Sequence, residues 1–168
     1  TIFRVATDVA ATSAFTFGSY DKAPSPLPHT FYLRVGGFTI LAATENNTKR
    51  NGITFYGPVC PLIEDIRVRG LCASDAKWHQ GHAIQMLECM SDGAAVNSQF
   101  PEVRDCDLFA CMVGFYATQA APINLHNVHS QAMRFRCAIL DGFGGTWTNS
   151  GLQNNFKDLD PHAWYGNR

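Results

Sequence analysis

The histidines of this chain form two pairs with the same spacing, His79 with His82 and His126 with His129. On a helix, residues three apart share one face, and two imidazoles placed there can bind one metal ion. On a strand, the same spacing turns the two rings to opposite faces of the sheet. Neither pair has the carboxylate of a helical metalloprotease motif, so the sequence predicts ordinary histidines and no metal site.

A short basic and aromatic segment is the most distinctive local feature, because Arg134 and Arg136 flank Phe135. It lies in a strand predicted over 131–140, and arginines two residues apart project from one side of a strand. Two guanidinium groups placed in this way can bind a carboxylate or a phosphate. These three residues are therefore candidate binding residues. In the alternative interpretation, each arginine pairs with an acid of a neighbouring element.

Two tryptophans near the end of the chain could bind a sugar, because Trp147 and Trp164 lie among asparagines. Sugar recognition needs a flat aromatic face together with polar neighbours that fix the orientation of the ring. Both tryptophans are therefore candidate binding residues of a carbohydrate-binding module. Alternatively, they pack the end of the chain onto its body.

No motif for nucleophilic catalysis is present, since the chain lacks the G-x-S-x-G elbow. The glycines of 142–145 precede neither a lysine nor a helix signal, which excludes a phosphate-binding loop, and the sequence predicts no cofactor. A secreted ribonuclease would need histidine, acid and arginine on one sheet face. His126, His129, Arg134 and Arg136 supply part of such a set without an identified acid, so a ribonuclease-like hydrolase stays an alternative.

The composition indicates one globular domain over residues 1–168. Charged residues make up 16%, below the roughly 25% of ordinary domains. The net charge of −1 provides no strong field for nucleic acid or for an anionic membrane. No window of 18 apolar residues is present, so the sequence predicts no transmembrane helix.

The cysteine count and the first residue suggest a secreted protein. Six cysteines are an even number, and the chain starts at Thr1 without a methionine, as a processed protein would. Free buried thiols are the alternative, and six cysteines allow 15 pairings, among which the sequence does not choose. The cysteines predicted to form disulfides are Cys60, Cys72, Cys89, Cys106, Cys111 and Cys137.

The order of predicted elements gives the fold class. Residues 1–71 contain several β-rich runs, two of which flank Gly36-Gly37, a hairpin signal. Helices are predicted near 75–90 and from Ser98 to about Cys111, and strands over 112–118 and 131–140. No internal repeat is found. We therefore predict an α+β fold, an antiparallel sheet with about two helices packed on one face and stapled by disulfides. An all-β sandwich is the alternative.

The segment Met133-Arg134-Phe135-Arg136 resembles a short aromatic–arginine–aromatic–basic motif in the Leptosphaeria family of avirulence and suppressing effectors, with Met133 in place of the first aromatic. The resemblance covers four residues. It implies a secreted fungal α+β protein without enzymatic activity that is recognised by plant immunity or interferes with it. We expect a secreted, non-enzymatic binding protein that acts on a host or extracellular protein partner or on a glycan. The alternatives are the ribonuclease-like hydrolase and the carbohydrate-binding module.

Overall fold

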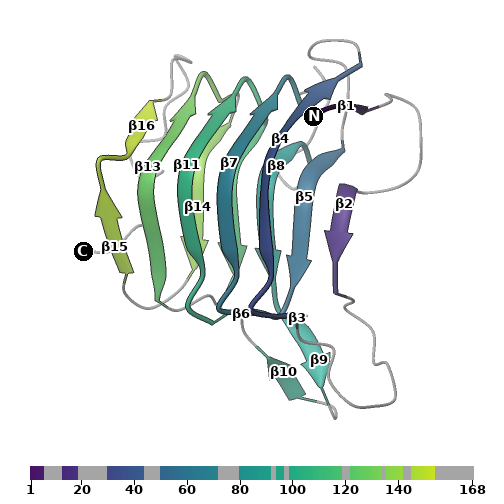
Figure 1. Ribbon diagram of the computed structural model, residues 1–168, viewed down its shortest axis with the longest axis vertical. Coiled ribbons are helices and arrows are strands. Elements are labelled where there is room, and N and C mark those ends of the chain that lie inside the picture. The colour runs from purple at the N-terminus through teal and green to yellow at the C-terminus, as the bar shows by residue number, and fades with distance from the viewer. Residues whose placement is uncertain are drawn as a thin grey trace.

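The computed structural model describes residues 1–5, 13–18, 30–43, 50–71, 80–91, 94–96, 99–118, 122–133, 135–141 and 145–153. Within these residues every regular element is a β-strand, and most of the strands form two sheets that face each other (Figure 1). The part of the chain described here contains no helix long and apolar enough to cross a membrane.

The larger sheet lies in front in Figure 1, and all of its neighbouring strands are parallel. Its order is β1-β4-β7-β11-β13-β15, and β16 also pairs with β13. Its strands are β1 (Ile2–Val5), β4 (Arg34–Ala42), β7 (Leu62–Arg69), β11 (Glu102–Phe109), β13 (Ile123–Gln131), β15 (Gly145–Thr148) and β16 (Gly151–Gln153).

The smaller sheet is also parallel, in the order β14-β12-β8-β5-β2. Because the chain visits the two sheets alternately, each coil adds one strand to each sheet, and the result is a parallel β-solenoid. Two short pairs lie outside these sheets, the parallel β3 and β6 and the antiparallel β9 and β10. The remaining strands are β2 (Ser13–Phe17), β3 (Thr30–Phe31), β5 (Asn51–Tyr56), β6 (Pro58–Val59), β8 (His82–Leu87), β9 (Cys89–Ser91), β10 (Ala94–Val96), β12 (Val113–Thr118) and β14 (Arg136–Asp141).

The core fills the space between the two sheets with columns of apolar side chains. Val35, Ile63, Val103 and Leu125 occupy equivalent positions on successive strands of the larger sheet and are all buried. Residues in register in a parallel sheet lie about 4.8 Å apart, so each column is continuous along the solenoid. At about 25 cal/mol per Å² of buried apolar surface, this stacking is the main source of stability.

A second column runs through the middle of the larger sheet and consists of residues with left-handed backbone. Gly37, Asp65, Asp105, Asn127 and Asn149 are in register on successive coils, and all have positive φ. Glycine, asparagine and aspartate adopt this conformation more readily than other residues do. Each of these residues bends its coil and shifts the inward alternation by one position. Inward residues therefore recur at intervals of three, two and three, as in Ile63, Ile66, Val68 and Leu71.

The two predicted helices are wrong where the structure describes them. Residues 82–87 of the first form β8, and 102–109 of the second form β11. The cause is visible in β11, where the bend at Asp105 makes the buried residues Val103, Cys106, Leu108 and Cys111 follow steps of three, two and three. Steps of three imitate the spacing of an apolar helix stripe. Residues 72–79 lie outside the described part.

The predicted antiparallel arrangement is also wrong. Gly36-Gly37 forms no hairpin, because both glycines lie inside β4 and Gly37 makes the left-handed bend. The alternative prediction, an all-β sandwich, has the right type of secondary structure but not the parallel coils of this fold. An internal repeat exists and was missed: Pro61–Leu71 (PLIEDIRVRGL) and Pro101–Cys111 (PEVRDCDLFAC) are in register on neighbouring strands and share their inward, bend and closing positions.

The prediction of a disulfide-stapled fold is wrong as well, since Cys60, Cys106 and Cys111 are free thiols. Cys106 belongs to an inward column, and its thiol donates a hydrogen bond to the Arg104 carbonyl oxygen at 3.2 Å. Burial raises the pKa of the Cys106 thiol to about 12. Cys72 and the side chains of Cys89 and Cys137 lie outside the described part.

The two adjacent glycines of β4 test this fold. A Cβ at position 36 would overlap the Glu64 carbonyl oxygen, whereas a Cβ at Gly37 meets nothing within 4 Å. Gly37→Ala should therefore cost only the left-handed backbone penalty, roughly 1–2 kcal/mol, and Gly37→Asn less. Gly36→Ala should cost more than either, as measured by chemical denaturation. Equal losses for Gly36→Ala and Gly37→Ala would contradict this register.

The thiols offer a second test. Because reaction with iodoacetamide requires an accessible thiolate, the half-buried Cys60 should be alkylated in the folded protein at pH 8, and Cys106 and Cys111 should not. Peptide mapping by mass spectrometry reads each site, and alkylation in denaturant is the control. Rapid native labelling of Cys106 would show that this strand is not packed as described.

Candidate anion-binding site

The outer face of the larger sheet is flat and rich in charge. In the coils of β7, β11 and β13 the left-handed residue and the residue before it both point outward, while the residue after it is buried, so polar side chains form columns that run across the strands. The described cations and acids on this face are equal in number, namely Arg4, Arg34, Arg67, Arg69 and Arg104 against Glu64, Asp65, Glu102, Asp105 and Asp107.

An ion-pair network crosses three strands near the amino ends of this sheet. The Glu64 carboxylate on β7 accepts hydrogen bonds from Arg34 on β4 and from Arg104 on β11, whose Nε and Nη2 lie 2.8 and 2.5 Å away. The bonds from Arg104 and Arg34 hold the pKa of Glu64 below its ordinary value of 4.5, against an opposing effect of burial. The same bonds raise the pKa of Arg104. Because these charged groups pair with one another, the network links three neighbouring coils.

A ladder of amides continues along the left-handed column. The Asn127 amide donates to Asp105 Oδ1 at 2.7 Å, and the Asn149 amide donates to Asn127 Oδ1 at 3.3 Å. The His129 ring Nε2 lies 3.2 Å from the same Asn127 oxygen. The spacing of 22 residues between these partners is one coil of the solenoid. The ladder therefore fixes the bend in the last coils.

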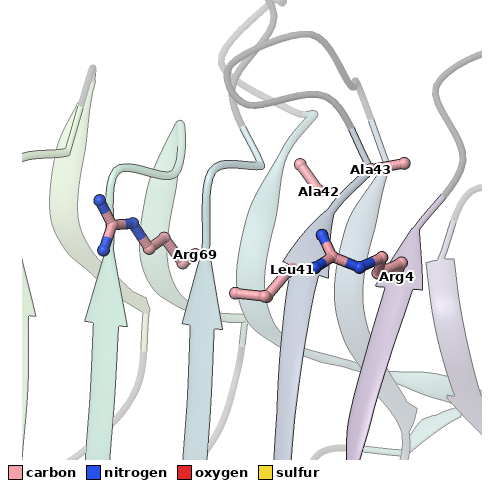
Figure 2. A pocket seen from close by; sticks show the side chains of 5 residues that line it. All are labelled: Arg4, Leu41, Ala42, Ala43 and Arg69. Carbon is pink, nitrogen blue, oxygen red and sulfur yellow. The ribbon is translucent and has the colours of Figure 1, made fainter.

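A pocket of about 310 Å³ opens at the carboxyl ends of β1, β4 and β7. Arg4, Leu41 and Arg69 are in register on these three strands, so Leu41 forms the floor between two arginines. Figure 2 shows Arg4 reaching across β4 above Leu41, while Arg69 extends toward β11. Ala42 and Ala43 complete the lining. Among the described residues no acid lines this pocket, so the lining described here is positively charged.

The two arginines of the pocket flank Leu41 from its two neighbouring strands, but only Arg4 lies over Leu41 in the structure. Their Cα atoms are two strands apart, about 10 Å, so both guanidinium groups would contact one anion only if the Arg69 side chain turned from β11 toward β4. The Arg69 guanidinium carbon lies 4.9 Å from the centroid of the Phe109 ring, which holds Arg69 at the rim. Guanidinium groups match carboxylates and phosphates in shape and remain charged at any physiological pH. The pocket is therefore suited to bind an anion and not to exchange protons.

The predicted basic and aromatic segment does not form a single strand. β13 ends at Gln131 and β14 begins at Arg136, so the strand predicted over 131–140 is not continuous, and the paired arginine surface stays a prediction. Phe135 is 37% exposed, and its backbone N–H donates to the Met112 carbonyl oxygen at 2.9 Å. Arg134 and the side chain of Arg136 lie outside the described part.

Only one of the two tryptophans of the predicted sugar site lies among the described residues. Trp147 lies on β15 in register with the inward Leu125, is half-buried and packs against the core. The structural alternative, a tryptophan that packs onto the body, therefore describes Trp147 correctly. Trp164 lies outside the described residues, so the structure does not test it.

The described histidines do not come together in one site. His82 is fully buried on β8 of the smaller sheet, where its ring stacks on Tyr116 at 4.7 Å. His126 and His129 both face outward on β13, because the bend at Asn127 lies between them, and they do not point to opposite faces as the strand spacing predicted. Among the described residues no three histidine, cysteine or acidic side chains are arranged to hold a metal. His79 lies outside the described part.

Sequence reasoning missed the residues that form the pocket, because Arg4 and Arg69 are 65 positions apart and carry no motif. The signal that could have placed Arg69 is the repeat of Pro61–Leu71 in Pro101–Cys111, which aligns Arg69 with Phe109 at the carboxyl ends of their strands. Only the pairing of β1 with β4 brings Arg4 to the same end.

No protein-family model, curated protein or solved structure is significantly similar to this chain.

The Glu64 network generates a prediction for pH dependence. Because the folded pKa of Glu64 lies below its unfolded value, its charge stabilises the fold above the unfolded pKa, and this contribution is lost as the pH falls through the folded pKa. Glu64→Gln should lower the melting temperature at pH 7 and weaken its dependence on pH between 5 and 3. Thermal unfolding at each pH measures both effects. An unchanged pH profile would show that another acid dominates.

Proposed function

We propose that this protein is a non-enzymatic binding protein that recognises a carboxylated glycan on the outer face of its larger sheet. The observation that carries this proposal is the positively charged pocket between Arg4 and Arg69, with Leu41 as its floor. A sugar carboxylate accepts hydrogen bonds from the guanidinium groups, and the apolar floor contacts the carbon atoms of the ring.

Binding is favoured over catalysis by the chemistry of the lining. The pocket contains two arginines and three aliphatic residues, and none of these can serve as nucleophile or general base at neutral pH. The nearest in-register acids of the face, on β11, are separated from the pocket floor by β7. The hydrolase alternative therefore has less support than a binding role.

A glycan is favoured over a nucleic acid and over a protein. The face has as many acids as arginines, so it lacks the excess of positive charge on which nucleic-acid affinity depends. Its outward side chains are charged groups, amides, threonines and histidines, with few apolar groups of the kind that form the centre of a protein interface. Hydroxyl groups of a sugar can pair with all of these polar side chains.

Secretion and the resemblance to effectors stay predictions, and glycan binding is compatible with both. The polar side chains of the face favour a glycan among the expected partners, while a host or extracellular protein remains the second candidate. Phe135 supports this second candidate only as an exposed aromatic side chain.

The test is the affinity for a uronic-acid polymer such as alginate, compared with a neutral polymer such as dextran. Affinity electrophoresis and calorimetry should detect binding of alginate that weakens with salt, and weak or no binding of dextran. Arg4→Gln should lower the affinity about tenfold or more, which matches the roughly 1.5–3 kcal/mol of a hydrogen bond to a charged group.

Arg50→Gln is the matched control, because Arg50 precedes β5 and lies outside the pocket. Its affinity for alginate should equal that of the original chain once thermal unfolding shows that the variant is folded. Equal affinity of the Arg4→Gln variant, or equal binding of dextran and alginate, would refute the proposed function.

A further inference from the structure

We infer that the carboxylated glycan lies along β4, with one end in the arginine pocket and the other at Tyr32. This inference rests on the proposed function and adds the direction of the polymer. It commits to a path parallel to the strands, in contrast to a path across them along the axis of the solenoid. The two paths use different residues, so mutations can separate them.

The outer surface of β4 is low over most of its length. Gly36 and Gly37 are exposed and carry no side chain, and Thr39 and Leu41 follow them as outward residues. Arg34, at the start of the strand, is drawn toward β7 by its bond with Glu64. A polymer that follows β4 therefore meets small side chains from the middle of the strand to the pocket.

Side chains of the two neighbouring strands rise on both sides of the second half of β4. Ile2 and Arg4 of β1 are in register with Thr39 and Leu41. Arg67 and Arg69 of β7 are in register with the same two residues on the other side. This half of the path is thus bordered by one exposed aliphatic side chain and by three arginines, of which Arg4 reaches across β4 above Leu41 and Arg69 extends toward β11.

Charge favours β4 over the next strands. No residue of β4 is acidic, whereas β11 exposes Glu102, Asp105 and Asp107 on the same face. A carboxylated polymer that ran across the strands toward β11 would be repelled by these acids. The repulsion is strongest at low ionic strength. Along β4, in contrast, the charge becomes more positive toward the pocket.

Tyr32 lies at the amino end of this path, two residues before the start of β4. Its side chain is 78% exposed, and its backbone is left-handed with a φ of 50°, which is unusual for a bulky residue. The Tyr32 N–H donates to the Val59 carbonyl oxygen at 2.9 Å, which holds this conformation. The exposed ring offers a flat face on which the carbon face of a sugar can stack.

The experiment begins with the length of the ligand. From Tyr32 to Leu41 the strand spans about 30 Å at 3.3 Å per residue. Calorimetry with alginate oligomers of increasing length should therefore show affinity that rises over several sugar units and then levels off. The Tyr32→Ala variant should bind the longest oligomer about tenfold more weakly and bind the shortest oligomer, which fills only the pocket, with unchanged affinity.

Two variants decide between the paths. Gly37→Asn places a side chain on the path, and the backbone tolerates it, since Asn127 and Asn149 occupy the same column. Gly37→Asn should weaken the binding of long oligomers and leave the binding of short oligomers unchanged. Phe100→Ala is the matched control for Tyr32→Ala, because Phe100 is 54% exposed with a φ of 50°, in register with Cys60 and Tyr32 but two coils away from β4. Phe100→Ala should change neither the affinity for long oligomers nor the affinity for short ones.

Alkylation of Cys60 tests the same path of the polymer by a chemical readout that does not depend on measured affinity. Cys60 follows Tyr32 in the next coil, so a bound long oligomer should slow its alkylation, and this protection should disappear in Tyr32→Ala. If Phe100→Ala weakens long oligomers and Gly37→Asn does not, the polymer runs across the strands and the inference is wrong. If Arg4→Gln leaves even short oligomers unaffected, the proposed function itself fails.

Discussion

The register of stacked coils is the constraint on which the rest of this structure depends. In a parallel sheet each residue lies about 4.8 Å from its equivalent in the next coil, so every property of one coil is imposed on its neighbours. The left-handed column shows this most clearly. Gly37, Asp65, Asp105, Asn127 and Asn149 bend their coils at the same point, and a coil without that bend would point its core side chains outward.

The bend also explains why the outer face is so polar. It places two outward positions next to each other, so each coil presents charged or amide groups in a cluster. Stacking then brings like positions together, and the side chains satisfy one another through the Glu64 network and the Asn127 ladder. Where stacking ends at β1, Arg4 has no further coil beyond it among the described strands, and its side chain lies over Leu41.

Several strands could be read from the sequence because they depend on local pattern alone. The strand predicted over 112–118 is confirmed as β12, and the β-rich runs predicted within 1–71 include β5 and β7, since β-branched and aromatic residues and short alternation favour strands wherever they occur. The helix predicted to end near Cys111 is wrong because a left-handed residue inside β11 breaks the alternation, and nothing local distinguishes that break from helical spacing.

The sequence by itself determined some of the strands, such as β12, and how little charge the chain carries. The tertiary structure alone decided that the strands are parallel, that His126 and His129 share a face, and that Arg4 meets Arg69. The reason is that composition and spacing act within a few residues of the chain. Pairing between neighbouring coils joins residues 22 to 40 positions apart, and only the common register of the solenoid selects those partners.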